Sequence, residues 1–225
     1  MTQQRTVLII DCCSEARKIY RQYLLAEQKF TYAILEAESG QGGLALCQSL
    51  SLDSILLEYQ LPDCNGLELL AQLQALNGSC PPVVMVTDGG NEAIAVKALK
   101  SGAEDYLVKG QVTAEEVRLA VRSAIENARL RRKLQEGEQR FKTSVENLLD
   151  CFGIYTSIRN DSGQIVDFQV EYVNPAACEH NCMTQEQQVG RRLCELFPAH
   201  QGSELFEEYC RVVETGEPLM KESVE

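Results

Sequence analysis

The first 126 residues alternate short apolar runs with longer amphipathic stretches. Five runs have the length and β-branched content of strands: 6–10, 32–37, 54–57, 83–86 and 106–108. The first, third and fourth are almost wholly apolar, which is typical of interior strands of a parallel sheet covered on both faces. The second mixes polar and apolar residues, so we expect it at an edge. The pattern predicts an α/β domain with a doubly wound, five-stranded parallel sheet.

Helix-capping residues indicate where the helices between these strands begin. Ser14 precedes the first helix, and Asn65 with Gly66 precedes the third. Thr113 and Glu116 have the spacing of a capping box before the fifth. Side chains of these types accept hydrogen bonds from the first free backbone N–H groups of a helix. The helix starts are therefore predicted from local chemistry alone.

The fifth helical pattern continues well past the end of this domain. Its larger apolar residues and one glycine recur at alternating spacings of four and three: Leu130, Leu134, Gly137 and Phe141. This spacing fits a short parallel two-stranded coiled coil, which the glycine weakens, and it fits a single solvated helix as well. We expect one domain over 1–126 and a linker helix over 127–145, and dimerisation through the helix stays open.

A different pattern begins near residue 146. Two strand-like runs, 152–158 and 165–173, flank the turn-forming sequence Asn160-Asp161-Ser162-Gly163. Helical segments are predicted at 176–183, 184–189 and 204–215, and a further strand near Leu219. We expect 146–225 to hold the first part of a second domain of the α+β class, because few residues follow that last strand to complete a sheet.

The composition changes the picture mainly through charge and cysteine content. The chain has 225 residues, a formal net charge of −12 and ten cysteines. An acidic surface disfavours binding to nucleic acid or to an anionic membrane, so protein partners are expected. No apolar run approaches the length of about 20 residues that spans a bilayer, and the N-terminus lacks a signal-peptide pattern. We expect a cytoplasmic protein with reduced thiols.

Four polar residues follow or end predicted strands of the first domain: Asp11, Glu58, Thr87 and Lys109. In an open parallel sheet the carboxyl ends of the strands meet at one rim, where binding and reactive groups collect. We therefore expect these side chains to converge although they lie far apart in the sequence.

Four segments together resemble the response-regulator receiver family, whose fold is flavodoxin-like: VLIIDCC at 7–13, ILLEYQLPDCNGLELL at 55–70, VVMVTDG at 83–89 and SGAEDYLVKG at 101–110. The resemblance implies a module that takes a phosphoryl group from a histidine kinase onto an aspartate after the third strand. It also implies that acidic residues of the rim hold Mg²⁺.

This sequence departs from that pattern at two positions. Glu58 stands at the phosphoacceptor position, and Cys12 follows Asp11 where the family has a second acidic residue. The resemblance leaves Asp11, Glu58 and Gln60 as ligands for Mg²⁺, and we expect weak binding because a thiol is a poor ligand for a hard cation. The longer Glu58 side chain reaches toward the space that a phosphoryl group on aspartate would enter.

Three further positions match the family's switch and phosphate-contact residues: Thr87, Tyr106 and Lys109. The resemblance implies that the threonine hydroxyl contacts the modified acceptor while the aromatic ring turns inward. A threonine and a tyrosine at strand ends also occur as ordinary packing residues. Gly110 follows the lysine where the family usually has proline, so the aim of the lysine is open.

The residues after about 140 resemble the front half of a PAS domain, through SVENLLDCFGIYTSIRNDSGQIVDFQVEYVNPAACEHN and GRRLCELFP. The resemblance implies a sensor and dimerisation module whose ligand is unknown. Cys178, His180 and Cys182 have no obvious fourth partner, so we do not expect a zinc site there.

These observations leave several functions open. A non-enzymatic pseudo-receiver with Glu58 as a partial phosphomimic, a docking scaffold and a phosphorylation-competent receiver all fit. A thiol redox or metal sensor is suggested by Cys12, Cys13 and Cys64. A nucleotide-binding enzyme is disfavoured, because no glycine-rich loop follows the first strand. A histidine kinase or another signalling protein is the expected partner, a homodimer is open, and an output domain beyond this chain could be an enzyme.

Overall fold

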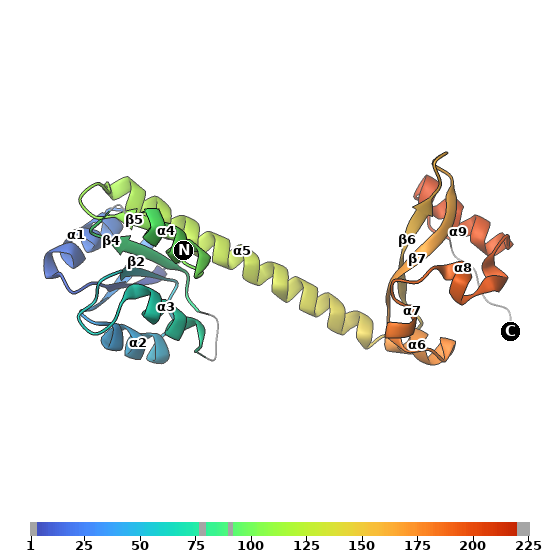
Figure 1. Cartoon of the computed structure of the whole chain (residues 1–225), viewed down its shortest axis with the longest axis horizontal. Helices are drawn as coiled ribbons and strands as arrows, with labels where there is room; N and C mark the ends of the chain where they lie inside the picture. The colour runs from blue at the N-terminus through green and yellow to red at the C-terminus, as the bar shows by residue number, and fades with distance from the viewer. Residues whose placement is uncertain (1–3, 77–79, 90–91, 220–225) are drawn as a thin grey trace. The chain divides into compact units, whose positions relative to one another are not determined.

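The computed structural model describes residues 4–76, 80–89 and 92–219 (Figure 1). The chain divides into two compact units between Leu134 and Gln135. Among the described residues, no helix combines the length and the apolar character that crossing a membrane requires.

The first unit contains a parallel sheet in the order β2-β1-β3-β4-β5. Its strands are β1 (Gln4–Ile10), β2 (Thr31–Ala37), β3 (Ser54–Glu58), β4 (Val83–Thr87) and β5 (Asp105–Val108). The five predicted strands are confirmed, and the mixed second strand lies at an edge as expected. The predicted doubly wound fold is therefore the observed one.

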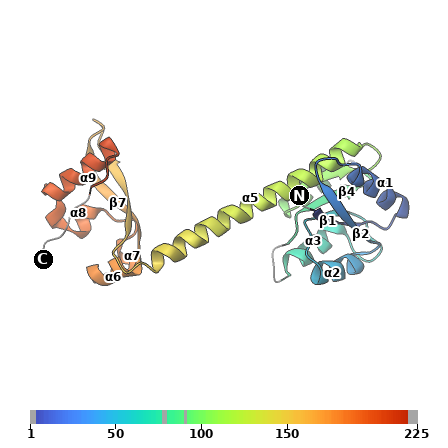
Figure 2. The same cartoon turned by 180° about the vertical axis from the view of Figure 1, so that it is seen from behind.

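Helices cover both faces of this sheet (Figures 1 and 2). They are α1 (Ser14–Leu25), α2 (Gly40–Ser49), α3 (Gly66–Gln74), α4 (Glu92–Lys100) and α5 (Ala114–Glu146). Because successive strand residues point to opposite faces, Val7 and Ile9 pack with α1 and α5, while Leu8 and Ile10 pack in the cluster formed with α2, α3 and α4. The two apolar clusters make the sheet a rigid base for its rim.

Two of the three predicted caps are confirmed. Asn65 accepts a hydrogen bond from the backbone N–H of Glu68 within a capping box, and Thr113 forms the same reciprocal pair with Glu116. The expectation that Ser14 caps the first helix is wrong. Ser14 is the first helical residue, and no side chain caps this end. The loop before α1 is held instead by hydrogen bonds from Arg17 to its backbone.

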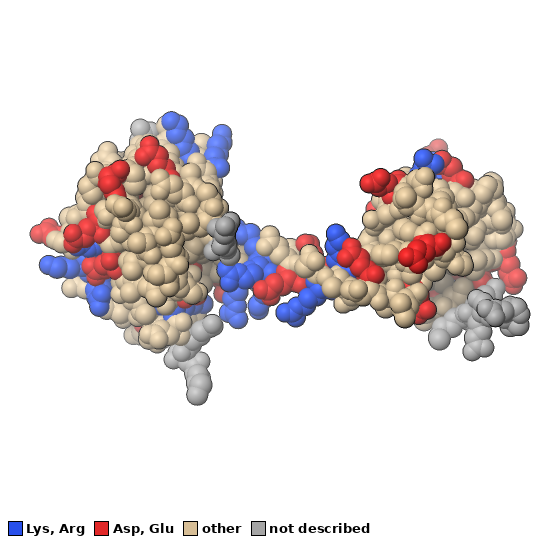
Figure 3. Space-filling model, turned by 90° about the horizontal axis from the view of Figure 1, so that it is seen from below, with Lys and Arg blue, Asp and Glu red and all other residues tan. Residues whose placement is uncertain are grey.

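Helix α5 continues far beyond the sheet, as its sequence pattern predicts. Its first turns are buried through Val117, Val121 and Ala124, whereas Leu130 and Leu134 are 56% and 64% exposed. Figure 3 shows basic side chains along the exposed stretch with acidic side chains among them. The division into compact units falls inside α5, and the boundaries 1–126, 127–145 and 146–225 stay predictions.

The second unit begins with an antiparallel hairpin of β6 (Gly153–Arg159) and β7 (Ile165–Val173). Asn160 organises the predicted turn, because its side-chain oxygen accepts hydrogen bonds from the backbone N–H groups of Ser162 and Gln164. The following helices are α6 (Pro175–Asn181), α7 (Gln185–Gln188), α8 (Leu193–Leu196), η1 (Pro198–His200) and α9 (Glu204–Thr215).

The helix predictions for this unit need two corrections. The segment expected over 176–183 ends earlier, because Cys182 adopts a left-handed conformation with φ of 51° that terminates α6. The short helices α8 and η1 were not predicted, since one turn of helix carries no measurable periodicity. Leu219 itself is not in a strand. The rest of the strand expected near it, in 220–225, lies outside the described residues.

Asn174 ties the end of α5 to this hairpin. The side chain is fully buried, and its oxygen accepts hydrogen bonds from the N–H groups of Phe152 and Ala177, each at 2.9 Å. Its amide nitrogen donates to the carbonyl oxygens of Asp150 at 2.9 Å and Val145 at 3.3 Å. The same nitrogen also lies 3.4 Å from the carbonyl oxygen of Leu148, so one amide side chain contacts five backbone groups where helix, strand and loop meet.

Candidate functional site

The residues expected at the rim of the first sheet do meet there. Asp11 follows β1, Glu58 ends β3, Thr87 ends β4 and Lys109 follows β5. The ammonium group of Lys109 lies 2.8 Å from Asp11 Oδ2 and forms a second ion pair with Glu58 Oε2. Both carboxylate side chains are only 2% exposed. Strand topology thus assembles a buried cluster of two carboxylates and one cation.

The charges in this cluster do not balance. Burial raises the pKa of Glu58 to about 7, and the nearby carboxylate of Asp11 adds to the rise while Lys109 opposes it. Burial by itself lowers the pKa of Lys109, but its hydrogen bonds to both carboxylates and their charges outweigh burial, so the net shift is upward. Lys109 is therefore charged at neutral pH, and Glu58 exchanges its proton near neutrality.

Glu58 has one carboxylate oxygen that finds no donor. Its Oε2 is taken by Lys109, whereas Oε1 is buried and no hydrogen-bond donor reaches it. A buried acceptor without a partner costs about 1–3 kcal/mol. Thr87 is also buried, and its backbone oxygen accepts a hydrogen bond from the N–H of Lys109 at 2.8 Å. The carboxylate of Glu58 is therefore buried with one oxygen unsatisfied.

Cys12 is the exposed member of the cluster at the rim. Its Sγ lies 3.9 Å from the backbone oxygen of Gln60. Ligand atoms of Asp11, Cys12 and Glu58 all lie within 4.8 Å of one another. The Mg²⁺ implied by the family resemblance does not fit this set, because a thiol sulfur stands where a hard oxygen ligand is required.

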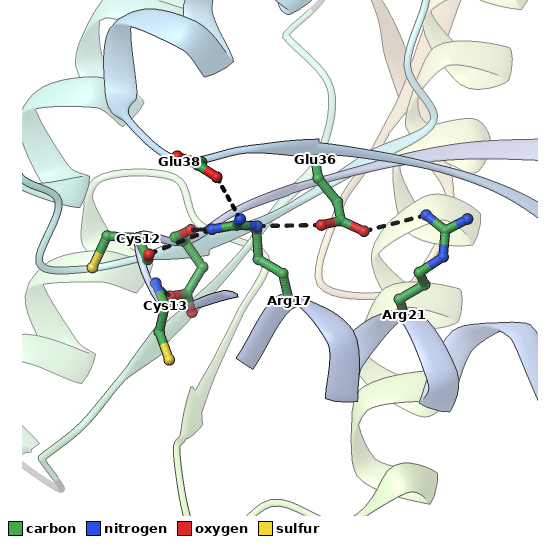
Figure 4. A network of polar contacts seen from close by, with 7 residues as sticks. Cys12, Cys13, Arg17, Arg21, Glu36 and Glu38 are labelled. Atoms are coloured by element: carbon green, nitrogen blue, oxygen red, sulfur yellow. Dashed lines mark hydrogen bonds and ion pairs between the residues drawn. The ribbon is translucent and has the colours of Figure 1, made fainter. Parts of the chain in front are cut away.

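Arg17 fixes the loop that carries Asp11 and Cys12 (Figure 4). Its Nη1 donates to the carbonyl oxygens of Asp11 at 2.7 Å and Cys12 at 3.4 Å. Its other nitrogens donate to Glu36 at 3.2 Å and Glu38 at 2.7 Å, both on the β2 side. A planar guanidinium suits such multiple contacts, so Arg17 links the loop after β1 to the edge of the sheet.

Arg17 was not singled out from the sequence, although a signal for it exists. It lies three and seven residues before Tyr20 and Leu24, the other buried residues of α1. A basic residue on the apolar stripe of an amphipathic helix is an exception to the usual pattern and indicates a buried polar network.

Comparison with known proteins identifies the family. Residues 7–122, about half of the chain, match the family model described as response regulator receiver domain. The chain belongs to the response-regulator receiver family. Residues 166–224 match the model described as PAS fold. The chain therefore combines a receiver domain and a PAS region of a two-component response regulator.

The curated relatives carry regulatory names. Transcriptional regulatory protein ResD of Bacillus subtilis is 32% identical over 148 residues, which cover 66% of this chain and 57% of that protein. Transcriptional regulatory protein SrrA of Staphylococcus aureus is 32% identical over 103 residues, covering 46% of this chain and 41% of that protein. The chain thus spans about half the length of the curated relatives it matches.

Solved structures agree with the receiver fold. A response regulator receiver domain protein from Clostridium thermocellum aligns with a TM-score of 0.50 and 26% identity, covering 56% of this chain and 98% of that one. The receiver domain of a LuxO-type repressor protein from Vibrio parahaemolyticus aligns with a TM-score of 0.53 and 23% identity, covering 59% of this chain and 98% of that one. The second likeness supports the fold alone.

Tyr106 and Gly110 complete the receiver positions. Tyr106 is half-buried against the apolar cluster beside α3, and its hydroxyl donates to the backbone oxygen of Gly89 at 3.0 Å. Gly110 has φ of 76°, a conformation that glycine adopts without strain. With Gly110 next to it, Lys109 still reaches both carboxylates. The switch roles of Thr87 and Tyr106 stay predictions.

The other cysteine candidates receive little support. In the described part of the chain, the single group of metal-ligating side chains that lie close together is Asp11, Cys12 and Glu58, so Cys178, His180 and Cys182 form no such group. Burial, followed by the charges of Asp63 and Glu68, raises the pKa of the Cys64 thiol. A raised pKa lowers the fraction of reactive thiolate, which disfavours Cys64 as a redox sensor.

Proposed function

We propose that this chain is a non-enzymatic regulatory module whose receiver domain acts without phosphorylation of β3. In this proposal Glu58 is a partial, permanent substitute for a phosphorylated aspartate. The observation that carries it is the buried ion pair between Glu58 and Lys109, which engages the lysine of the rim without any phosphoryl group. The domain would then be held part of the way toward its signalling form without phosphorylation.

The substitution is partial for reasons of charge and shape. A phosphoryl group carries about 1.5 to 2 negative charges and three terminal oxygens, whereas ionised Glu58 carries one charge and two oxygens. Because the pKa of Glu58 is about 7, even that single charge is lost in part of the molecules at neutral pH. We therefore expect an intermediate position of the switch rather than its fully active form.

The same pocket disfavours phosphoacceptance. A nucleophilic carboxylate must reach a phosphodonor with a divalent cation beside it, and here Lys109 holds Glu58 while Cys12 supplies sulfur in place of oxygen. A phosphorylation-competent receiver would require Glu58 to be released from Lys109 and an oxygen ligand in place of the Cys12 sulfur.

Location and partners are part of the proposal. Receiver domains interact with histidine kinases, and we propose a histidine kinase or another signalling protein as the partner. Pairing of two chains through the exposed part of α5 and the PAS region is a further proposal. All ten cysteines are free, as in the reducing cytoplasm, where we place the module.

The first experiment tests phosphoacceptance. The full chain is incubated with a small-molecule phosphodonor and millimolar Mg²⁺, and its intact mass is measured. No phosphoryl adduct is expected on the wild type, and the double variant Cys12→Asp/Glu58→Asp is the positive control. A stoichiometric adduct on wild-type Glu58 would contradict the proposal.

The second experiment separates a phosphomimic from a docking scaffold. Backbone NMR shifts of 83–89 and 105–110 are compared between the wild type and the double variant with and without Mg²⁺ and beryllofluoride, which mimics a bound phosphoryl group. We expect wild-type shifts to lie between the two states of the variant. Wild-type shifts that coincide with the unliganded variant would leave the docking scaffold as the function.

A further inference from the structure

We propose that the pocket binds a borderline transition-metal ion of the Zn²⁺ class through Cys12, Asp11, Glu58 and the backbone oxygen of Gln60. The site would give this receiver a metal-dependent input at the position where its family uses Mg²⁺. The proposal is independent of whether Glu58 acts as a phosphomimic, since it concerns which ion the donor atoms select.

The donor atoms are close to the spacing that one ion requires. Zinc lies about 2.0–2.3 Å from nitrogen, oxygen and sulfur ligands, so two donors on one ion are at most roughly 4.6 Å apart. The donors of Asp11, Cys12 and Glu58 lie within 4.8 Å of one another, and Gln60 O lies 3.9 Å from the sulfur. Cys12 is exposed, so a small rotation of its side chain closes the set.

A second observation points to a cation independently of that spacing. Glu58 is 3% exposed, and its Oε1 has no hydrogen-bond donor. Lys109 uses the other oxygen of this carboxylate, so a metal ion can bind Oε1 without displacing the lysine. Asp11 keeps lone pairs beyond its contacts with Lys109 and with the N–H of Cys13, because a carboxylate offers about four acceptor sites.

The formal charges also favour a divalent ion with a thiolate ligand. When both carboxylates are ionised and no metal is bound, Asp11 and Glu58 share the single positive charge of Lys109, which leaves one uncompensated negative charge in a buried place. When the ion binds, the Cys12 thiol releases its proton to solvent and a metal–sulfur bond forms. Three anionic ligands are then balanced by the divalent ion and Lys109, and the cluster is neutral.

The donor types decide which divalent ion is selected. Thiolate sulfur favours borderline and soft metals, whereas Mg²⁺ requires six hard ligands in octahedral geometry. A mixed set of one sulfur and three oxygens suits Zn²⁺ or Co²⁺, both of which accept four ligands. The replacement of an acidic residue by Cys12 thus changes the ion that this pocket prefers.

The full chain is titrated with Co²⁺, because a Co²⁺–thiolate bond gives a near-ultraviolet charge-transfer band that Zn²⁺ lacks. In the wild type we expect the band to saturate at one equivalent of Co²⁺. The band should be absent in Cys12→Ser. Zn²⁺ should displace Co²⁺ and abolish the band, whereas millimolar Mg²⁺ should not. Cys13→Ser is the matched control, because Cys13 is also exposed and adjacent but lies outside the cluster. It should retain the band.

Zn²⁺ affinity is measured in parallel by equilibrium dialysis with the same proteins. We expect Cys12→Ser and Glu58→Gln each to weaken the site at least about 10-fold, while Cys12→Asp binds Mg²⁺ more tightly than the wild type. Equal Co²⁺ spectra in the wild type and Cys12→Ser would overturn the proposal, as would competition by Mg²⁺ at equal concentration. Cys12→Ala replaces Cys12→Ser if the latter fails to fold.

Discussion

The titration of Glu58 gives a quantitative prediction about stability. The pKa of this carboxyl group rises from 4.5 to about 7 on folding, so the folded state holds its proton more tightly than the unfolded state. Between these values unfolding releases a proton, and the free energy of unfolding therefore falls as the pH rises. The loss begins near pH 4.5 and is complete above about pH 7, where both states are ionised.

The magnitude follows from the size of the shift. At about 1.4 kcal/mol per pH unit, a rise from 4.5 to about 7 corresponds to at most about 3.5 kcal/mol. Glutamine at this position has nearly the same shape but does not titrate. The stability of Glu58→Gln relative to the wild type should therefore increase by about 2–3 kcal/mol between about pH 5 and pH 8.

Urea denaturation of the two proteins, followed at half-unit intervals of pH, measures this difference. Glu15→Gln controls for the loss of one negative charge, because Glu15 is exposed on the first turn of α1. That control should follow the wild-type profile. Parallel profiles for the wild type and Glu58→Gln across this range would refute the assigned pKa and its cause, the burial of Glu58 beside Asp11.

Three further predictions concern the rim and the helix junction. Cys12→Asp together with Glu58→Asp should restore Mg²⁺ binding and reactivity with a phosphodonor by more than the two single changes combined, because both groups address one cation. An inert but folded double variant, by calorimetry and intact mass, would contradict this. Arg17→Met should lower the free energy of unfolding by about 2–4 kcal/mol, because the buried carbonyl oxygen of Asp11 loses its donor and the partly exposed Glu36 loses its ion pair. Arg21→Met removes only an exposed ion pair and should cost less than about 1 kcal/mol. Equal losses in urea denaturation would exclude the special role of Arg17. Asn174→Ala should speed amide hydrogen exchange at 145–152 and lower the free energy of unfolding of the second unit by about 2–4 kcal/mol, because buried backbone groups lose their partner. Unchanged exchange would show that the junction does not depend on this side chain.

Local sequence chemistry was enough to predict most elements. The apolar runs of β1, β3 and β4 are readable because a strand buried on both faces must be apolar along its whole length. The caps at Asn65 and Thr113 are readable because they bond to their own helices within three residues. The prediction failed at Ser14 because the side chain of Arg17, one turn into α1, holds the loop through backbone carbonyl groups and no N-cap side chain is used.

The sequence was enough to predict which residues lie at the rim, but not how their side chains pair. Their place after successive strands follows from the topology of a parallel sheet, so the sequence alone is enough to group Asp11, Glu58, Thr87 and Lys109. Which oxygen each carboxylate presents to Lys109, and which is left without a donor, depends on side-chain packing across the sheet. No pattern along the chain encodes those distances.

The receiver fold, the edge position of β2, the extension of α5 and the chemical departures at Cys12 and Glu58 can all be inferred from the amino-acid sequence. The burial of Arg17 beneath the loop after β1 and the junction that Asn174 makes between α5 and the hairpin become visible only in the folded chain. The difference lies in the range over which each interaction acts. Periodicity and capping act between neighbours on the chain, whereas charge balance, burial and hydrogen-bond satisfaction are set by groups that only folding brings together.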